Sequence, residues 1–140
     1  MTIDIESLPT GARLPDFLVP PISRAALALY AGASGDHNPV HIDIDVARKA
    51  GYPDVFAQGM LVMAHLARSL TRLAPQHGLR SYSARFVGIT PIGTELVCSA
   101  VVKERLVADG ERRVRLALSV SARGDAQDVK ITGEAVVAFP

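Results

Sequence analysis

The densest polar cluster in the chain is the segment 34–41, which reads Ser-Gly-Asp-His-Asn-Pro-Val-His. Its Asp36 carboxylate and His41 imidazole are groups that can hold and release protons. Pro39 excludes regular helix through the segment, so the loop can fold back and bring both side chains to one point. A carboxylate and an imidazole that converge on one atom can act as general acid and base. The segment therefore predicts a proton-transfer site, with Asn38 fixing the loop or orienting a water.

Two other interpretations of this segment involve no proton transfer. Asp36 and Asn38 stand next to glycine and proline, where such side chains commonly bond nearby backbone amides and simply form turns. A calcium-binding loop that starts at Asp36 would need oxygen ligands at its fifth and twelfth positions, where Val40 and Ala47 stand. The calcium interpretation fails, whereas the turn-forming one stays open beside the proton-transfer site.

A transition-metal site is a further alternative for the same segment. His37 and His41 are four residues apart, and Asp43 and Asp45 follow closely. Zinc proteins with this histidine spacing hold both imidazoles on one helical face, which Pro39 forbids, and no His-Glu-x-x-His pattern is present. We therefore expect no metal and no cofactor.

The second informative feature is Gln58-Gly59-Met60, at the start of a predicted long helix. The first backbone amides of a helix lack intrahelical acceptors and lie at the positive end of the helix dipole. Gly59 leaves its N–H open to a ligand oxygen, and there it would stabilise negative charge that develops on a carbonyl oxygen. In the alternative interpretation Gly59 only starts the helix, and Met60 belongs to the core.

Three helices should position these residues. Ser23 is a good N-cap for a helix that runs to about residue 32, and Asp43 or Asp45 should cap a brief helix through Lys49. The long helix, 59–74, has a polar stripe at helical spacing. The stripe consists of His65, Arg68, Ser69, Arg72 and Gln76. Residues 60–64 are apolar on every side, so the start of this helix must be enclosed on all faces.

From residue 80 onward the hydrophobic period changes to two, which is typical of strands. We expect strands over about 80–89, 94–105, 111–123 and 129–139, joined as antiparallel hairpins in a meander because the breaks between them are short and rich in turn residues. Residues 11–21, with three prolines, suit an edge strand or an extended arm. The fold class is therefore α+β, with an antiparallel sheet that curves around one long central helix.

Composition limits the remaining possibilities. A chain of 140 residues with 49% hydrophobic and 21% charged residues predicts one compact domain over residues 1–140. The formal net charge of +1 argues against a nucleic-acid partner. No apolar stretch approaches the roughly 20 residues that span a bilayer, and the acidic first residues do not resemble a signal peptide. The lone Cys98 cannot form an internal disulfide, so we expect a cytoplasmic protein.

Several stretches of the chain, in order, resemble one family. They are Tyr-Ala-Gly-Ala-Ser-Gly-Asp-His-Asn-Pro-Val-His at 30–41, Ala47, Phe-Ala-Gln-Gly-Met-Leu at 56–61, Arg-Phe-Val at 85–87 and Pro-Ile-Gly at 91–93. Together they resemble the MaoC-like hydratases, hot-dog-fold enzymes also called (R)-specific enoyl-CoA hydratases or hydratase 2. The match runs from about residue 10 to the C-terminus, and its Gly-Asp-x-Asn-Pro-x-His core is highly specific.

The resemblance implies an activity and a set of roles. Asp36 and His41 would form the catalytic pair, with Asn38 in support and the Gly59 N–H as donor to the thioester oxyanion. The pair would add water to a trans-2-enoyl thioester, giving the (R)-3-hydroxyacyl product, or carry out the reverse dehydration. Which of the two groups transfers which proton stays open, because a shared water would let them act as one unit.

The surroundings of the pair carry over less directly. Val55, Phe56 and Met60 would border the acyl pocket, although each suits a plain core position equally well. Many relatives have His-Gly before the central helix, whereas Gln58 stands here in place of that histidine. Glutamine keeps hydrogen-bonding capacity but cannot carry charge. We interpret this as a change in loop support, with the catalytic pair intact.

The resemblance also bears on partners. Hot-dog subunits pair side by side into a continuous sheet with the acyl tunnel near their interface, so we expect a homodimer or a heterodimer with another hot-dog subunit. The substrate would be an acyl-CoA or acyl-ACP thioester, two carriers that end in the same phosphopantetheine arm. Alternatives are a hot-dog acyl thioesterase, or a subunit of a heterodimeric (3R)-hydroxyacyl-ACP dehydratase that depends on its partner for activity.

Overall fold

The fold is a five-stranded antiparallel sheet curved over one long helix. The structure is a computed structural model and describes residues 3–139. The strands are β1 (Phe17–Val19), β2 (Leu79–Phe86), β3 (Leu96–Ala108), β4 (Glu111–Ala122) and β5 (Asp125–Phe139), in the order β1-β3-β4-β5-β2. All four neighbouring pairs are antiparallel. The expected α+β class is confirmed.

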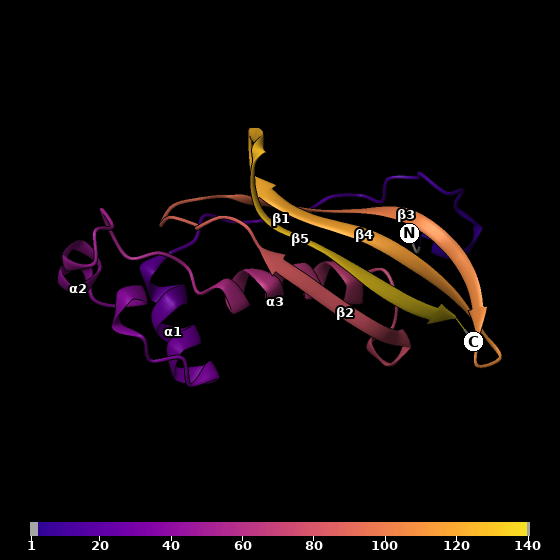
Figure 1. The fold of residues 1–140 in the computed structure, drawn as a ribbon, viewed down its shortest axis with the longest axis horizontal. Helices are drawn as coiled ribbons and strands as arrows, with labels where there is room; N and C mark the ends of the chain where they lie inside the picture. The colour runs from indigo at the N-terminus through magenta and orange to yellow at the C-terminus, as the bar shows by residue number, and fades with distance from the viewer. Residues whose placement is uncertain (1–2, 140) are drawn as a thin grey trace.

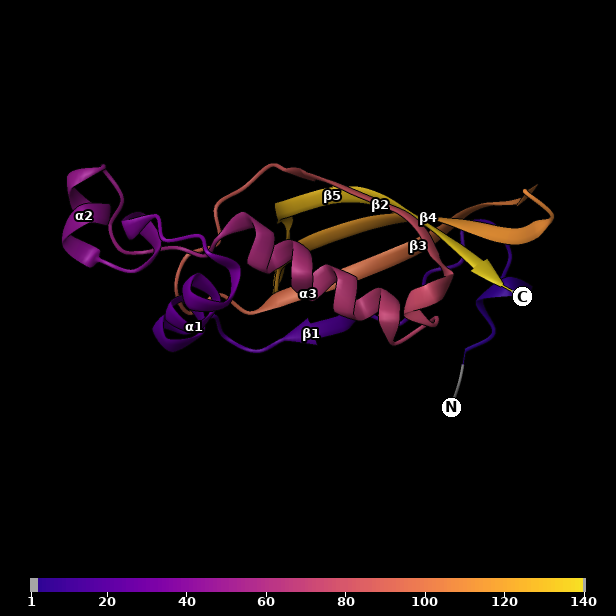
Figure 2. The same cartoon turned by 90° about the horizontal axis from the view of Figure 1, so that it is seen from below.

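Within residues 3–139, three α-helices and three short 3₁₀ turns accompany the sheet. The helices are α1 (Arg24–Ser34), α2 (Ile44–Lys49) and α3 (Gly59–Thr71), and the turns are η1 (Ile5–Ser7), η2 (Pro39–His41) and η3 (Gln76–Gly78). Helix α3 runs along one face of the sheet, whereas α1 and α2 lie beyond one end of it (Figures 1 and 2). Among the described residues, no helix is long and apolar enough to cross a membrane.

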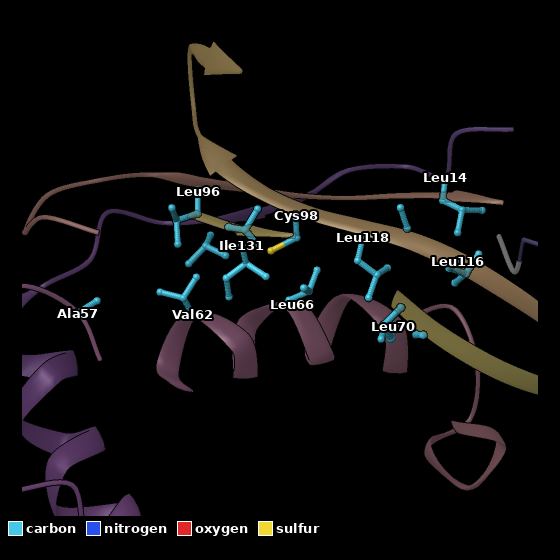
Figure 3. Close-up of a cluster of buried hydrophobic side chains, with 14 of the residues drawn as sticks. Leu14, Ala57, Val62, Leu66, Leu70, Leu96, Cys98, Leu116, Leu118 and Ile131 are labelled. Atoms are coloured by element: carbon cyan, nitrogen blue, oxygen red, sulfur yellow. The ribbon is translucent and has the colours of Figure 1, made fainter. Parts of the chain in front are cut away.

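The core lies between α3 and the sheet. Val62, Leu66 and Leu70 occupy one face of α3 at spacings of four residues, and each is at most 2% exposed. Figure 3 shows these side chains directed at apolar residues of the strands. The sheet residues labelled there include Leu96, Cys98, Leu116, Leu118 and Ile131. Burial of this helix face against alternate strand residues holds the two layers together.

The ends of the first two helices follow from single residues. Ser23 Oγ accepts a hydrogen bond from the Ala26 amide at 3.1 Å, which confirms the predicted cap of α1. This helix runs past Gly32 to Ser34 and ends at Gly35, whose φ of 78° lies in the left-handed region that glycine favours. Asp43 caps α2 by accepting from the amides of Asp45 and Val46.

The strand order corrects one expectation. The meander from β3 through β4 to β5 is confirmed, but β2 and β3 do not form a hairpin, because β2 pairs with β5 at the opposite side of the sheet. The segment 87–95 instead crosses from one side to the other. Its start is fixed to β5 by the Val87 and Gly88 amides, which both donate to the Lys130 carbonyl. Alternation of residues marks a strand but does not identify its neighbour.

The environment of α3 corrects two further expectations. Its first turn is not enclosed by this chain, since Met60 is 55% exposed and Ala64 is also exposed. The predicted polar stripe includes Ser69, which is buried and donates from Oγ to the Leu66 carbonyl at 2.6 Å. A serine that bonds back into its own helix satisfies its hydroxyl without water. His65 is half-buried, and burial is the main cause that lowers its pKa.

Candidate active site

The loop 34–41 is built by a relay of side chains that accept from backbone amides. Ser34 Oγ accepts from the Asp36 amide at 3.1 Å, Asp36 Oδ1 from the Asn38 amide at 3.2 Å, and Asn38 Oδ1 from the Val40 amide at 3.2 Å. The turn-forming role considered for Asp36 and Asn38 is therefore present. This turn uses only Oδ1 of the Asp36 carboxylate, so Oδ2 can contact another group.

That second oxygen faces His41. Asp36 Oδ2 lies 3.9 Å from His41 Nε2, although the two residues are five positions apart in the sequence. The separation is too long for a direct hydrogen bond, but one water about 2.8 Å from each atom would contact both. The His41 side chain is 11% exposed, whereas the Asp36 side chain is 42% exposed. The pair thus joins a sheltered imidazole to a carboxylate that solvent can reach.

The other imidazole nitrogen fixes the orientation of the ring. His41 Nδ1 lies 2.8 Å from the Phe56 carbonyl oxygen. A carbonyl oxygen only accepts, so Nδ1 carries the hydrogen and, in neutral imidazole, Nε2 presents its lone pair toward Asp36. The Phe56 ring packs edge-on against His41 with centroids 4.9 Å apart, and the Tyr52 ring supports Phe56 at 4.6 Å. Backbone and aromatic contacts together set one tautomer and one ring position.

The start of α3 lies directly after the residue that holds His41. Gln58 is 1% exposed, and its Nε2 donates to the Leu27 carbonyl of α1 at 3.1 Å. Its Oε1 has no hydrogen-bond partner among residues 3–139. The side chain ties α1 to α3, in keeping with the support role inferred for it. Gly59 then opens α3, and a Cβ at this position would come 3.1 Å from the Phe86 ring.

The three residues expected around an acyl chain have different surroundings. Val55 is 2% exposed and belongs to the core. Phe56 is half-buried against His41. Met60 points outward on the first turn of α3, where it is 55% exposed. Within this chain the structure brings only Phe56 to the Asp36 and His41 pair.

Two features at the same end of α3 were not found by inspection of the sequence. Phe86 covers Gly59. Its membership of the Arg-Phe-Val stretch at 85–87 is the sequence feature that could have pointed to it. Lys130 is 4% exposed. The sequence feature that could have pointed to it is a charged residue between Val129 and Ile131 in an otherwise apolar strand segment. No group of three or more His, Cys, Asp or Glu residues within 3–139 is placed to hold a metal ion.

Comparison with known proteins places the chain in a family. Residues 12–124 match the family model described as MaoC like domain. The chain is 35% identical over 115 residues (79% of its length) to a fatty acid synthase subunit beta of Aspergillus oryzae, and 37% identical over 65 residues (46%) to 3-hydroxyacyl-thioester dehydratase X of Mycobacterium tuberculosis. These alignments cover 5% and 22% of the two relatives.

The solved structures agree with this match. R-hydratase PhaJ1 from Pseudomonas aeruginosa superposes with a TM-score of 0.80 at 29% identity, over 95% of this chain and 83% of that one. The five-stranded sheet and its central helix thus form a hot-dog fold. On the family match over residues 12–124, the chain belongs to the MaoC-like domain family.

Proposed function

We propose that this chain is a hydro-lyase that interconverts trans-2-enoyl thioesters and (R)-3-hydroxyacyl thioesters. The observation that carries the proposal is the placement of Asp36 Oδ2 3.9 Å from His41 Nε2. The turn bond uses the other carboxylate oxygen, Oδ1, and the Phe56 carbonyl holds the other ring nitrogen, Nδ1. Relatives named R-hydratase and 3-hydroxyacyl-thioester dehydratase support it. The substrate carrier is CoA or acyl carrier protein.

In the proposed hydration the Asp36 and His41 pair holds a water between Oδ2 and Nε2. The water oxygen bonds to C3 of the enoyl group as the C2–C3 π bond opens, one water proton passes to the pair, and C2 receives a proton from the pair. Dehydration follows the same path in reverse. Because the two groups share one water, the proton transfers are assigned to the pair rather than to either residue. Asn38 keeps the loop in the geometry that this requires.

In this proposal the start of α3 stabilises the negative charge that develops on the thioester oxygen. The Gly59 N–H lies among the first amides of a 13-residue helix, where the helix dipole and the unpaired donors favour an oxyanion. His41 is fixed to the Phe56 carbonyl only three residues earlier. One short piece of backbone therefore positions both the acid-base pair and the proposed oxyanion donor.

A second hot-dog subunit completes the proposed acyl pocket. The outer edge of β2 has no partner strand within residues 3–139, and exposed apolar side chains gather at its end and at the start of α3. They are Met60, Phe86, Val87 and Ile89, each between 46% and 55% exposed. Pairing of β2 with a second subunit, identical or related, would cover them and enclose an acyl pocket beside Phe56 and Met60.

The compartment and the domain organisation are also proposals. We propose a cytoplasmic protein on the ground that the lone Cys98 is buried and free, and therefore suited to a reducing environment. We likewise propose that residues 1–140 form a single MaoC-like domain.

Turnover of crotonyl-CoA by the purified chain tests the proposed function. We expect loss of the enoyl absorbance and, by chiral analysis, the (R)-3-hydroxy thioester. Longer enoyl chains, enoyl-ACP and co-expressed hot-dog partners extend the assay if crotonyl-CoA is not turned over. Release of free CoA would indicate a thioesterase and would overturn the proposal, as would a folded, inactive protein under all of these conditions.

A further inference from the structure

Lys130 is a buried cation that the proposed chemistry does not use. It is 4% exposed although it lies in a strand of the sheet. The register explains its placement: Val120 pairs with Ile131 and Ser121 with Val129, so Lys130 is the extra residue of a β-bulge. A bulge breaks the alternation of a strand and re-aims one side chain. Figure 1 shows β5 bending sharply near its start.

Lys130 holds the segment that follows β2 through both its backbone and its side chain. Its carbonyl accepts from the Val87 and Gly88 amides at 3.0 and 3.3 Å, and its Nζ donates to the Ile89 carbonyl at 2.7 Å. Asp128 Oδ1 accepts from the same ammonium at 2.7 Å. The approach is close, because a Cβ on Gly88 would come 2.6 Å from the Val129 carbonyl oxygen.

The segment that Lys130 holds is in turn the support of the candidate active site. Directly after Ile89, the Thr90 carbonyl accepts from the Ala57 amide at 2.9 Å, and Pro91 forms a β-bridge with Phe56. Phe56 is the residue whose carbonyl fixes His41. At the other end of the segment the Phe86 ring lies against Gly59.

One small crevice is bordered both by the segment that Lys130 holds and by the start of α3. This narrow crevice is lined by Gly59, Phe86, Thr90 and Lys130 among others. Lys130 therefore borders the same space as the first amide of α3. Its ammonium is satisfied by Ile89 and Asp128, so it acts on that space through the backbone it holds.

We propose that Lys130 is a positioning residue for the hydratase site: by fixing residues 87–91 it sets the position of the 56–59 backbone. This inference rests on the proposed function. An apolar side chain would fill the same space without the desolvation penalty of a buried ammonium. A lysine whose carbonyl holds the Val87 and Gly88 amides and whose ammonium holds the Ile89 carbonyl is explained by the geometry it maintains.

Steady-state kinetics of Lys130→Met test the proposal. Methionine keeps an unbranched apolar stem and removes the bonds to Ile89 and Asp128. We expect kcat to fall about tenfold with KM nearly unchanged, because a small displacement of catalytic groups slows the chemical step. Lys130→Arg, which can still donate to Ile89, should recover most of the rate. The matched control is Lys103→Met, which removes an exposed lysine paired with Glu134 on the same sheet and should leave kcat unchanged.

A spectroscopic measurement separates positioning from mere stability. In an Asp36→Asn background, which blocks turnover, a bound 2,4-hexadienoyl thioester should absorb at longer wavelength as the α3 amide polarises its carbonyl. Addition of Lys130→Met should reduce this shift. Gly88→Ala keeps the lysine but displaces the same segment, because its Cβ would come 2.6 Å from the Val129 carbonyl oxygen. It should reduce the shift too, which gives a second variant if Lys130→Met does not fold.

The outcomes distinguish the two proposals. An active wild type, together with folded Lys130→Met or Gly88→Ala proteins whose kcat and spectral shift are unchanged, overturns the role of Lys130 alone. A wild type without hydratase activity overturns the proposed function and this inference with it.

Discussion

The two halves of α3 differ in what surrounds them. Toward its C-terminal end, Leu66 and Leu70 are at most 2% exposed and belong to the core of this chain. At its N-terminal end, Met60 is 55% exposed, and the helix meets the candidate active site. The C-terminal half is thus buried on its sheet side by this chain, whereas the N-terminal half is buried at Val62 and open at Met60. The proposed chemistry therefore lies at the open end of the helix, and the enclosed end contributes to the core.

The largest expected effect on stability is at the enclosed half. Leu66→Ala should lower the free energy of unfolding by about 2–5 kcal/mol, because it leaves a cavity between helix and sheet. Chemical denaturation would measure the loss. Leu29→Ala is the matched control, since Leu29 is 76% exposed and its truncation should change little. Equal losses of stability in the two variants would contradict the burial of Leu66 in the core and the exposure of Leu29 on α1.

A smaller effect on stability is expected at the short helix α2, which lies beyond the end of the sheet. Asp43→Ala removes the carboxylate that accepts from the first amides of α2, and should destabilise this short helix by about 1 kcal/mol. Faster amide hydrogen exchange over residues 44–49 would report the loss. Asp45→Ala is the control, because Asp45 lies in the first turn without capping it. An unchanged exchange rate in Asp43→Ala would show that the cap does not hold α2.

The sequence predicted more of the enclosed half than of the open half. Spacing of apolar residues located α3 and the strands, and single residues such as Ser23 and Asp43 located helix starts. The neighbour of β2 could not be predicted, because pairing across the sheet depends on contacts such as that between Val87 and Lys130. The sequence also could not show that Met60 is exposed, since an apolar helix start gives no information about which chain covers it.

Within the candidate site, residue type was more informative than spacing. Asp36 and His41 were identified by their chemistry and by a motif resemblance, and the structure places them 3.9 Å apart. The contact between His41 and the Phe56 carbonyl could not be predicted, because it joins a side chain to a backbone atom whose direction depends on the fold. Lys130 was missed because a bulge, which follows no residue pattern here, turns it inward.

Acid should weaken a contact in the sheet, away from the candidate site. Hydrogen bonds from Arg80 and Arg113 lower the pKa of Glu111 from its usual 4.5 to about 2. A lowered pKa in the folded state means that the stabilisation is present above pH 4.5 and is lost as the pH falls toward 2. Thermal unfolding of the wild type and of Glu111→Gln should therefore differ above pH 4.5 and converge near pH 2. A constant difference across this range would contradict the assignment.

The smallest expected effect on the chain's own stability is at Met60. Met60→Gln replaces an exposed apolar side chain and should change the free energy of unfolding by less than about 0.5 kcal/mol. If a second subunit covers this residue as proposed, the same variant should weaken self-association or association with a related subunit in analytical ultracentrifugation. A loss of monomer stability comparable to that of Leu66→Ala would instead mean that this chain already buries Met60.

The central claim is that Asp36 and His41 act as one unit, and the most direct test is a double-mutant cycle on kcat with a turned-over enoyl thioester. Asp36→Asn and His41→Ala should each lower kcat by about 10²–10⁴-fold, and the double variant should be about as slow as the slower single variant. All three must remain folded by circular dichroism. Losses that multiply in the double variant, or a single variant that retains the wild-type rate, would contradict a shared water held by the pair.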